Sequence, residues 1–428
     1  MLNRVIAPPS RPVEQVALPT AEVTRLSNGA RLHVLANTAQ PVIRLQVVFP
    51  AGRWYDPTPG VSLLTARALL EGTTTRTARQ IADEVAFYGA SLDCEQGFDR
   101  STLTLYCLSK YLPQLLPLVQ DVLLNATFPE AELELIKTRT IQNIRVERQK
   151  TSYLAAERLS RNLFGPEHPY GISFDEQAFA LLSAKAVQDF YRHNYSLSQA
   201  EVFLCGDVEE SHISSLSKLL GETVAEQQPR SIPAVAPVTQ QATDYVTVKE
   251  SLQATLRLGR LSPPPSHPDY HALQVLVKVL GGYFGSRLMK NIREDKGLTY
   301  GIYASIAPRE HATNIVIGSD VNAANASAAI HEINVELARL QNELIPDEEL
   351  ETVRNYTTGK FLNELGTVFE QCDKYKTLIL FNLPLNFYSH YLSTVNSIEP
   401  KALQELAKHY LSTNELIEVV AGPTTVLT

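Results

Sequence analysis

The stretch FPEAELELIKTRT, residues 128–140, recurs later in the chain as IPDEELETVRNYT, residues 345–357. Each copy opens with a proline that suits the first turn of a helix, and acidic residues follow it. The matching residues are Pro129 with Pro346, Glu132 with Glu349, Leu133 with Leu350, Glu134 with Glu351 and Thr140 with Thr357, all 217 positions apart (128 to 345). One shared helix start is weak evidence by itself for a repeat.

Both surroundings follow the order of strand, apolar helix, Gly stop, strand pair and helix. In the first half the residue pattern predicts a hairpin at 24–36, strands at 42–49, 92–94, 101–108 and 201–205, and helices at 61–70, 77–88, 112–124, 128–148, 153–163 and 183–193. The second half predicts strands at 254–258, 298–304 and 312–319, and helices at 269–280, 327–340 and from 345. This order at one offset predicts a duplicated α+β domain, each copy a mostly antiparallel sheet with helices on one face.

The predicted organisation is an N-terminal arm (1–22), a first domain (23–221), a linker (222–243) and a second domain (244–428). The linker is assigned because Pro, Gln, Ala and Thr dominate it and no periodic apolar pattern survives there. A chain of 428 residues is too long for one ordinary core, which agrees with two domains.

Composition excludes several classes of protein. The formal net charge of −8 argues against a nucleic-acid surface. No run of eighteen apolar residues or signal-peptide core appears, so we expect no membrane span and a cytoplasmic location. The four cysteines have no CxxC spacing and are expected to be unpaired residues of a reducing compartment.

The stretch SRLMKNIREDKGLTYGIY, residues 286–303, combines a helix, a stop and a strand. Leu288, Met289 and Ile292 have helical spacing among charged residues, and Gly297 is expected to end the helix in the left-handed conformation. Arg293 near the helix end and Tyr300 on the strand could together grip a peptide carbonyl or a developing oxyanion. The simpler interpretation is a surface arginine and a half-buried strand tyrosine.

The duplicated chain resembles the pitrilysin/insulysin/mitochondrial processing peptidase family of zinc metallopeptidases. The resemblance rests on LSNGARLHVL, FPAGRWYDPTPGVSLLTARALLEGT, GASLD and FGPEHPYG in the first half. In the second half it rests on HPDYHALQVLVKVLGG, SRLMKNIREDKGLTYGIYA and IPDEELETVRN. It covers nearly the whole chain and implies that the two homologous domains form one half of a clamshell.

The chain departs from this family at its metal site. Active members carry His-x-x-Glu-His on a helix, with a third ligand, a Glu, about 75 residues later. Here the two His positions fall on Leu63 and Arg67, the general-base position on Ala66, and the third ligand near Asn143. A hydrophobe, an alanine and a permanent cation cannot hold zinc, so no cofactor is expected in this chain. His267 and His271 have i, i+4 spacing but are better explained as a polar helix N-terminus.

The resemblance implies that Arg293 and Tyr300 match the Arg-x6-Tyr pair of the family. The chain is thus expected to be the non-zinc subunit of a heteromeric peptidase, supplying this pair in trans to a zinc-bearing paralogous subunit that acts on peptide substrates. The alternative is a catalytically inactive structural or peptide-binding subunit similar to the core proteins of respiratory complexes. In isolation the chain could form a homodimer, and an independent Cys or Ser enzyme has little support.

Overall fold

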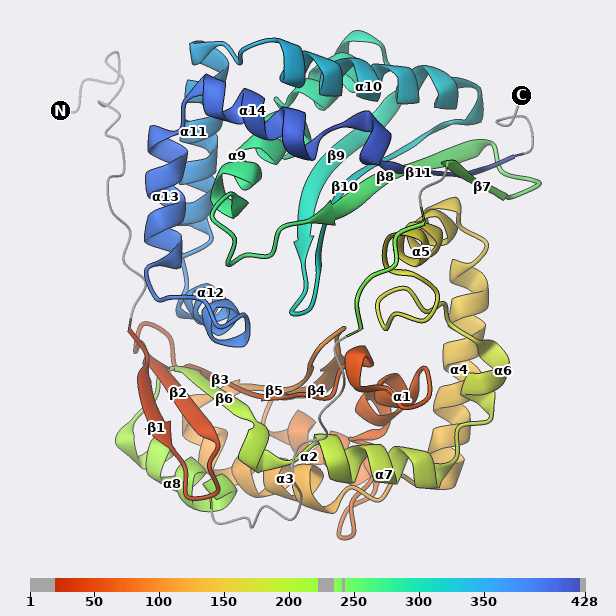
Figure 1. Cartoon of the computed structure of the whole chain (residues 1–428). Coiled ribbons are helices and arrows are strands. Elements are labelled where there is room, and N and C mark those ends of the chain that lie inside the picture. The colour runs from red at the N-terminus through yellow and green to blue at the C-terminus, as the bar shows by residue number, and fades with distance from the viewer. Residues whose placement is uncertain (1–19, 222–234, 241–242, 424–428) are drawn as a thin grey trace, which may run out of the picture.

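The computed structural model describes residues 20–221, 235–240 and 243–423, which form two halves whose sheets face each other (Figure 1). The N-terminal sheet has the order β1-β2-β6-β3-β5-β4, and all neighbours are antiparallel except the parallel pair β2 and β6. Its strands are β1 Glu22–Arg25, β2 Arg31–Ala36, β3 Val42–Phe49, β4 Ser91–Gln96, β5 Ser101–Leu108 and β6 Glu201–Gly206.

The C-terminal sheet repeats this plan without the first strand. Its order is β7-β11-β8-β10-β9, with β7 and β11 parallel and the other neighbours antiparallel. Its strands are β7 Thr243–Thr247, β8 Gln253–Ser262, β9 Thr299–Pro308, β10 Thr313–Asn322 and β11 Ile417–Gly422. The two mostly antiparallel sheets confirm the predicted fold class.

Helices cover the outer face of each sheet (Figure 1). The first half holds α1 Val61–Ala68, α2 Ala78–Phe87, α3 Leu112–Asn125, α4 Glu130–Glu147, α5 Thr151–Phe164, α6 Glu176–Ala180, α7 Ala184–Asn194 and α8 Glu210–Gly221. The second half holds α9 Tyr270–Gly281, a π-helical turn η4 Met289–Asp295, α10 Ala326–Asn342, α11 Asp347–Asn363, α12 Val368–Leu380, α13 Phe387–Ser397 and α14 Pro400–Tyr410. Short 3-10 turns make up the remaining elements.

The two halves start and end corresponding helices with the same residue types. Pro129 and Pro346 both precede the first helical residue, with φ of −58° and −59°, so α4 and α11 begin 217 residues apart (130 to 347). Gly89 and Gly297 both end a helix with positive φ, 60° and 62°, in the left-handed region that glycine tolerates. The offset is not constant elsewhere, because β9 follows β4 by 208 residues (91 to 299). Loops of different length separate the repeated elements.

One helix from each half crosses to the sheet of the other half, which the sequence did not indicate. The N-terminal helix α5 packs on β8 and β11, where Leu159 joins Ile417 and Val419 in one apolar cluster. The C-terminal helix α12 packs on β2 and β6, where Tyr375 joins Phe203. The expectation that helices cover one face only is therefore incomplete, since these two lie on the inner faces.

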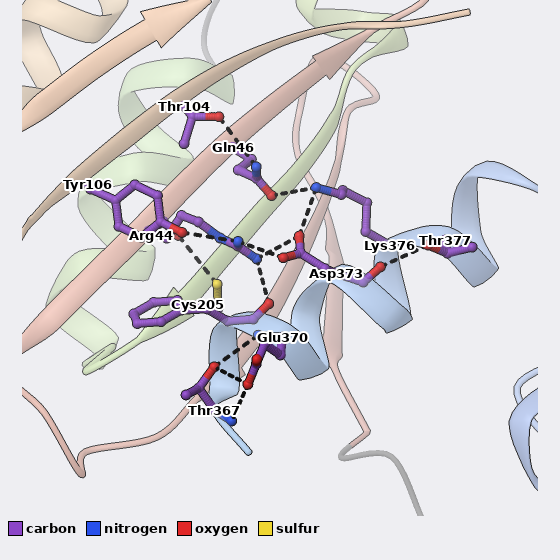
Figure 2. Close-up of polar contacts among 11 residues, drawn as sticks. Arg44, Gln46, Thr104, Tyr106, Cys205, Thr367, Glu370, Asp373, Lys376 and Thr377 are labelled. Carbon is purple, nitrogen blue, oxygen red and sulfur yellow. Dashed lines mark hydrogen bonds and ion pairs between the residues drawn. The ribbon is translucent and has the colours of Figure 1, made fainter. Parts of the chain in front are cut away.

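Polar contacts accompany the apolar contact of α12 (Figure 2). Arg44 on β3 donates from Nη1 and Nη2 to the Asp373 carboxylate, at 2.9 and 3.0 Å, and from Nη2 to the Phe369 carbonyl at 2.8 Å. Lys376 donates to the Asp373 carboxylate and to Gln46, both at 2.9 Å. Burial by itself lowers the pKa of Arg44, but the hydrogen bonds to Asp373 and the nearby negative charge together outweigh burial, and the net shift is upward.

A second contact between the halves lies at the tip of the β9–β10 hairpin. Arg100 donates two hydrogen bonds to Glu310, at 2.7 and 2.8 Å. The His311 ring stacks on Trp54 with 3.8 Å between ring centroids. The Glu310 backbone N–H donates to the Asp99 carboxylate at 3.1 Å. The hairpin that begins near Tyr300 is thus anchored in the first half.

The predicted arm and linker fall largely outside the described residues. For the arm this leaves Thr20, Ala21 and the start of β1 at Glu22. For the linker it leaves residues 235–240 and the first residue of β7, Thr243. Residues 235–240 run along the end of α5, where Val238 N–H donates to the Phe164 carbonyl at 3.0 Å.

Candidate functional site

The helix that would carry the metal motif is α1, and its first turn is fixed by a buried carboxylate. Asp56 accepts hydrogen bonds from the backbone N–H of Gly60, at 2.8 Å, and of Ser62, at 2.7 Å. Burial raises the pKa of Asp56 to about 6, although these bonds oppose the shift. Gly60 adopts φ of 93°, which lets the chain turn sharply into the helix.

The predicted degenerate residues lie on two helices in contact, α1 and α4. On α1, Leu63 packs against the first-half core, Ala66 is buried and Arg67 is largely exposed. Asn143 is exposed on α4. The two helices are joined by Arg67, whose Nη1 donates to Thr140 Oγ1 at 2.6 Å. Thr140 is three residues before Asn143, so both lie on one face of α4.

These residues do not fit a zinc ion. Leu63 and Ala66 offer no donor atom, and the Arg67 guanidinium has only N–H donors and a permanent positive charge. Partial burial lowers the pKa of Arg67, but the group stays charged. Across residues 20–221, 235–240 and 243–423, no three His, Cys, Asp or Glu side chains gather to hold a metal.

The histidine pair before and on α9 also forms no metal site. His267 Nδ1 accepts from the Asp269 backbone N–H at 3.1 Å. His271 packs against Phe387, with 4.4 Å between ring centroids, and burial lowers its pKa. Only His267 agrees with the predicted exposed, polar helix start, because His271 is half-buried among aromatic rings.

Arg293 and Tyr300 lie in the second half on either side of Gly297. The predicted helix before Gly297 is a π-helical turn over Met289–Asp295, and its apolar residues Met289 and Ile292 are buried as the spacing predicted. π-Helical turns are rare and are often found at functional sites. Arg293 is partly exposed, and its guanidinium lies 4.4 Å from the centre of the Phe284 ring.

Tyr300 is 95% exposed on β9, which is an edge strand of the C-terminal sheet. The simpler interpretation of a half-buried strand tyrosine is therefore wrong. In the part of the chain that the structure describes, neither Arg293 nor Tyr300 has a side-chain hydrogen bond or ion pair. Both polar groups are consequently available to a ligand.

A groove of about 460 Å³ lies beside this pair. Phe284, which carries the Arg293 guanidinium, forms part of its wall, and so does Gly301, the neighbour of Tyr300. Tyr303 lies against Gly318, where a Cβ would come within 2.6 Å of its ring. Sequence reasoning missed Phe284 and Tyr303, although both are aromatic residues close to the predicted pair.

Comparison with known proteins identifies the architecture. Residues 32–169 match the Insulinase (Peptidase family M16) family, and residues 182–356 match the Peptidase M16 inactive domain. The chain belongs to the M16 peptidase family. The family predicted from the sequence motifs is therefore confirmed, and the second half is of the type described as inactive.

The relatives and solved structures agree with this assignment. The chain is 24% identical over 342 residues to "Uncharacterized zinc protease YmxG" of Bacillus subtilis, covering 79% of this chain and 83% of that protein. It is 21% identical over 369 residues to "Non-peptidase homolog YmxG" of Helicobacter pylori, covering 83% of each.

Two solved structures share the fold. One is the peptidase M16 inactive domain from Pseudomonas fluorescens, with a TM-score of 0.84 at 23% identity over 94% of this chain and 98% of that one. The other is a protease from Helicobacter pylori, with a TM-score of 0.86 at 19% identity over 95% and 100%. In the described residues, no helix has the length and apolar character needed to cross a membrane.

Proposed function

We propose that this M16 protein is the non-zinc subunit of a heteromeric peptidase. It would supply Arg293 and Tyr300 in trans to a zinc-bearing paralogous chain that hydrolyses peptides. The observation that carries the proposal is the contrast between the two halves. The helix α1 has Arg67 bonded to Thr140 where a metal ligand would be needed. In contrast, Arg293 and Tyr300 make no side-chain hydrogen bond or ion pair with any residue that the structure describes.

The chemistry of the pair supports roles for each residue. The Tyr300 hydroxyl can donate a hydrogen bond to the oxyanion that develops at a peptide carbonyl during hydrolysis. The Arg293 guanidinium, supported on the Phe284 ring, can hold a carbonyl or carboxylate of the substrate through two N–H groups. The neighbouring groove offers aromatic walls to a peptide side chain.

The same proposal includes a zinc-bearing partner subunit, no resident cofactor in this chain and a cytoplasmic location. Zinc is expected in the partner subunit because α1 lacks donors for it. A reducing compartment agrees with the four free cysteines at 94, 107, 205 and 372.

The test is to co-express the chain with a zinc-bearing paralogue from the same genome and to assay peptide cleavage. The isolated chain should be inactive, and the mixture should be active. Tyr300→Phe should lower kcat by about 100-fold, as loss of one oxyanion donor does, and should change KM little. Tyr245→Phe is the matched control, since Tyr245 is an exposed strand tyrosine of the same sheet.

Two results would overturn the proposal. One is chelator-sensitive cleavage by the isolated chain. The other is a Tyr300→Phe complex that cleaves as fast as the wild type, which would favour a structural or peptide-binding subunit. The name "Non-peptidase homolog" of the Helicobacter pylori relative gives that second function its support. A stable homodimer of the chain that binds no paralogue would favour it further.

A further inference from the structure

A second pocket, separate from the groove beside Tyr300, lies among the helices of the C-terminal half. It has a volume of about 170 Å³, and its lining residues come from α9, α11, α12 and α13. Three lysines line it, Lys278 on α9, Lys360 on α11 and Lys374 on α12, together with Glu364 just after α11. Three ammonium groups thus line the pocket together with a single carboxylate.

The protein itself supplies only part of that counter-charge. Lys374 Nζ lies 2.6 Å from a Glu364 oxygen and Lys360 Nζ lies 3.9 Å from the other. One carboxylate therefore serves two ammonium groups. Lys278 has no ion pair among the residues that the structure describes. Burial lowers the pKa of Lys278, and the positive charges of Lys360 and Lys374 add to this shift while Glu364 opposes it.

An unpartnered hydroxyl in the same pocket gives independent evidence. Thr357 on α11 is 3% exposed and lines the pocket, and its Oγ1 has no hydrogen-bond partner in the part of the chain that the structure describes. Its counterpart in the repeat is Thr140, whose Oγ1 accepts a hydrogen bond from Arg67. The first half thus satisfies this hydroxyl with a cationic side chain, whereas the second half offers it no partner among the described residues. A buried polar group without a partner is costly, so a ligand that bonds to it gains stability.

The aromatic walls fix one of the ammonium groups in place. Lys374 Nζ lies 5.7 Å from the centre of the Phe361 ring and 5.8 Å from that of Tyr388. Contacts of this kind hold a cation without neutralising it. The pocket therefore offers positioned ammonium groups and a hydroxyl inside a largely apolar wall.

We propose that this pocket binds a small oxyanion, held by the ammonium groups of Lys278, Lys360 and Lys374 and by the Thr357 hydroxyl. The size of the pocket limits the ligand. At roughly 30 Å³ for each water of liquid volume, it accommodates a phosphate or a short carboxylate but no nucleotide. Either ligand bears oxygens that accept hydrogen bonds from lysine and threonine.

The experiment is calorimetric titration of the full chain with sodium phosphate and, separately, with sodium acetate, at constant ionic strength set by chloride. Saturable 1:1 binding of one or both is expected, and the two titrations distinguish phosphate from carboxylate as the source of the oxyanion. Lys278→Met and Thr357→Val should each weaken binding at least tenfold. Lys401→Met, which removes an exposed lysine of α14, is the matched control and should bind like the wild type.

Two outcomes would overturn the proposal. The first is the absence of saturable binding of both anions to the wild-type chain. The second is equal weakening in the Lys401→Met control, which would indicate attraction by overall charge alone. If Lys278→Met fails to fold, Lys360→Met replaces it, because Lys360 is 47% exposed and its removal leaves the helix core intact.

Discussion

Arg67 shows how a single side chain changes what α1 and α4 can bind. Its hydrogen bond to Thr140 joins the two helices at the place where a metal would need ligands from both. We predict that Leu63→His, Ala66→Glu, Arg67→His and Asn143→Glu together restore a zinc site, because the helices already lie in contact. Two ligands one helical turn apart on α1 and a third on α4 would supply the three protein ligands of a catalytic zinc.

The measurement is zinc stoichiometry of the purified quadruple variant by elemental analysis. The expected value is about one ion per chain, against none for the wild type. The matched control keeps Arg67 and carries the other three substitutions, since its guanidinium would repel the ion. A quadruple variant that folds and binds no zinc would show that Asn143 is not the third-ligand position.

The contribution of Asp121 to the free energy of unfolding should depend on pH. Its carboxylate accepts from Thr73 at 2.6 Å, Thr75 at 2.7 Å and Arg76 at 2.8 Å. Burial raises the pKa of Asp121, but these bonds and one from Asn125 outweigh burial and lower it to about 2. Because the pKa of Asp121 is lower in the folded protein than the unfolded value of 3.8, its charged form stabilises the fold above pH 3.8. This stabilisation is lost as the pH falls through about 2.

The expected result for Asp121→Asn is a free energy of unfolding lower by about 2 kcal/mol at pH 7, following 1.36 kcal/mol per pKa unit. The difference from the wild type should shrink as pH falls from 4 towards 2. Urea unfolding at a series of pH values measures this. Asp83→Asn, at an aspartate of α2 whose side chain is 71% exposed, should leave the urea midpoint unchanged at each pH. A pH-independent difference at Asp121 would contradict the assignment to its charge.

At the scale of elements, local signals were predictable and partnerships between elements were not. Gly297 ends its helix and Pro346 starts one because each acts on its own backbone, so the sequence predicts both. The π-helical turn before Gly297 differs from an α-helix only in its hydrogen-bond partners, which apolar spacing does not specify. Amphipathic spacing likewise indicates that α5 and α12 bury one face, but not that each buries it on the other half's sheet.

At the candidate site, too, local features were predictable from the sequence and contacts between distant elements were not. Motif matching located Arg293 and Tyr300 on a helical turn and a strand, and both elements are present. It could not give the exposure of Tyr300, which depends on β9 being the edge of its sheet. It also could not find the pocket of Lys278, because the lining residues come from four helices and lie as many as 117 positions apart, from Gln274 on α9 to Tyr391 on α13.

At the level of the whole molecule, two parts of the second half contact the first half. One contact is α12 on the N-terminal sheet with the Arg44–Asp373 pair, and the other is the hairpin tip with the Arg100–Glu310 pair. In the first half, helix α5 packs on β8 and β11 of the second sheet, and its Arg158 forms an ion pair with Asp244 on β7. The arrangement of the halves should therefore survive the loss of either ion pair and change only when both are removed.

We predict that Asp373→Ala and Glu310→Ala each lower the free energy of unfolding by about 2 kcal/mol, because each leaves an arginine without its carboxylate. Arg44 is only 5% exposed, so its loss of Asp373 should be the more costly. The double variant should show a larger radius of gyration by small-angle X-ray scattering, while each single variant keeps the wild-type value. Asp83→Ala, at an exposed ion pair of α2, is the control that should change neither quantity. A double variant as compact as the wild type would mean that the contacts left in place fix the two halves, namely the packing of α5 and α12, the stacking of His311 on Trp54 and the Arg158–Asp244 ion pair.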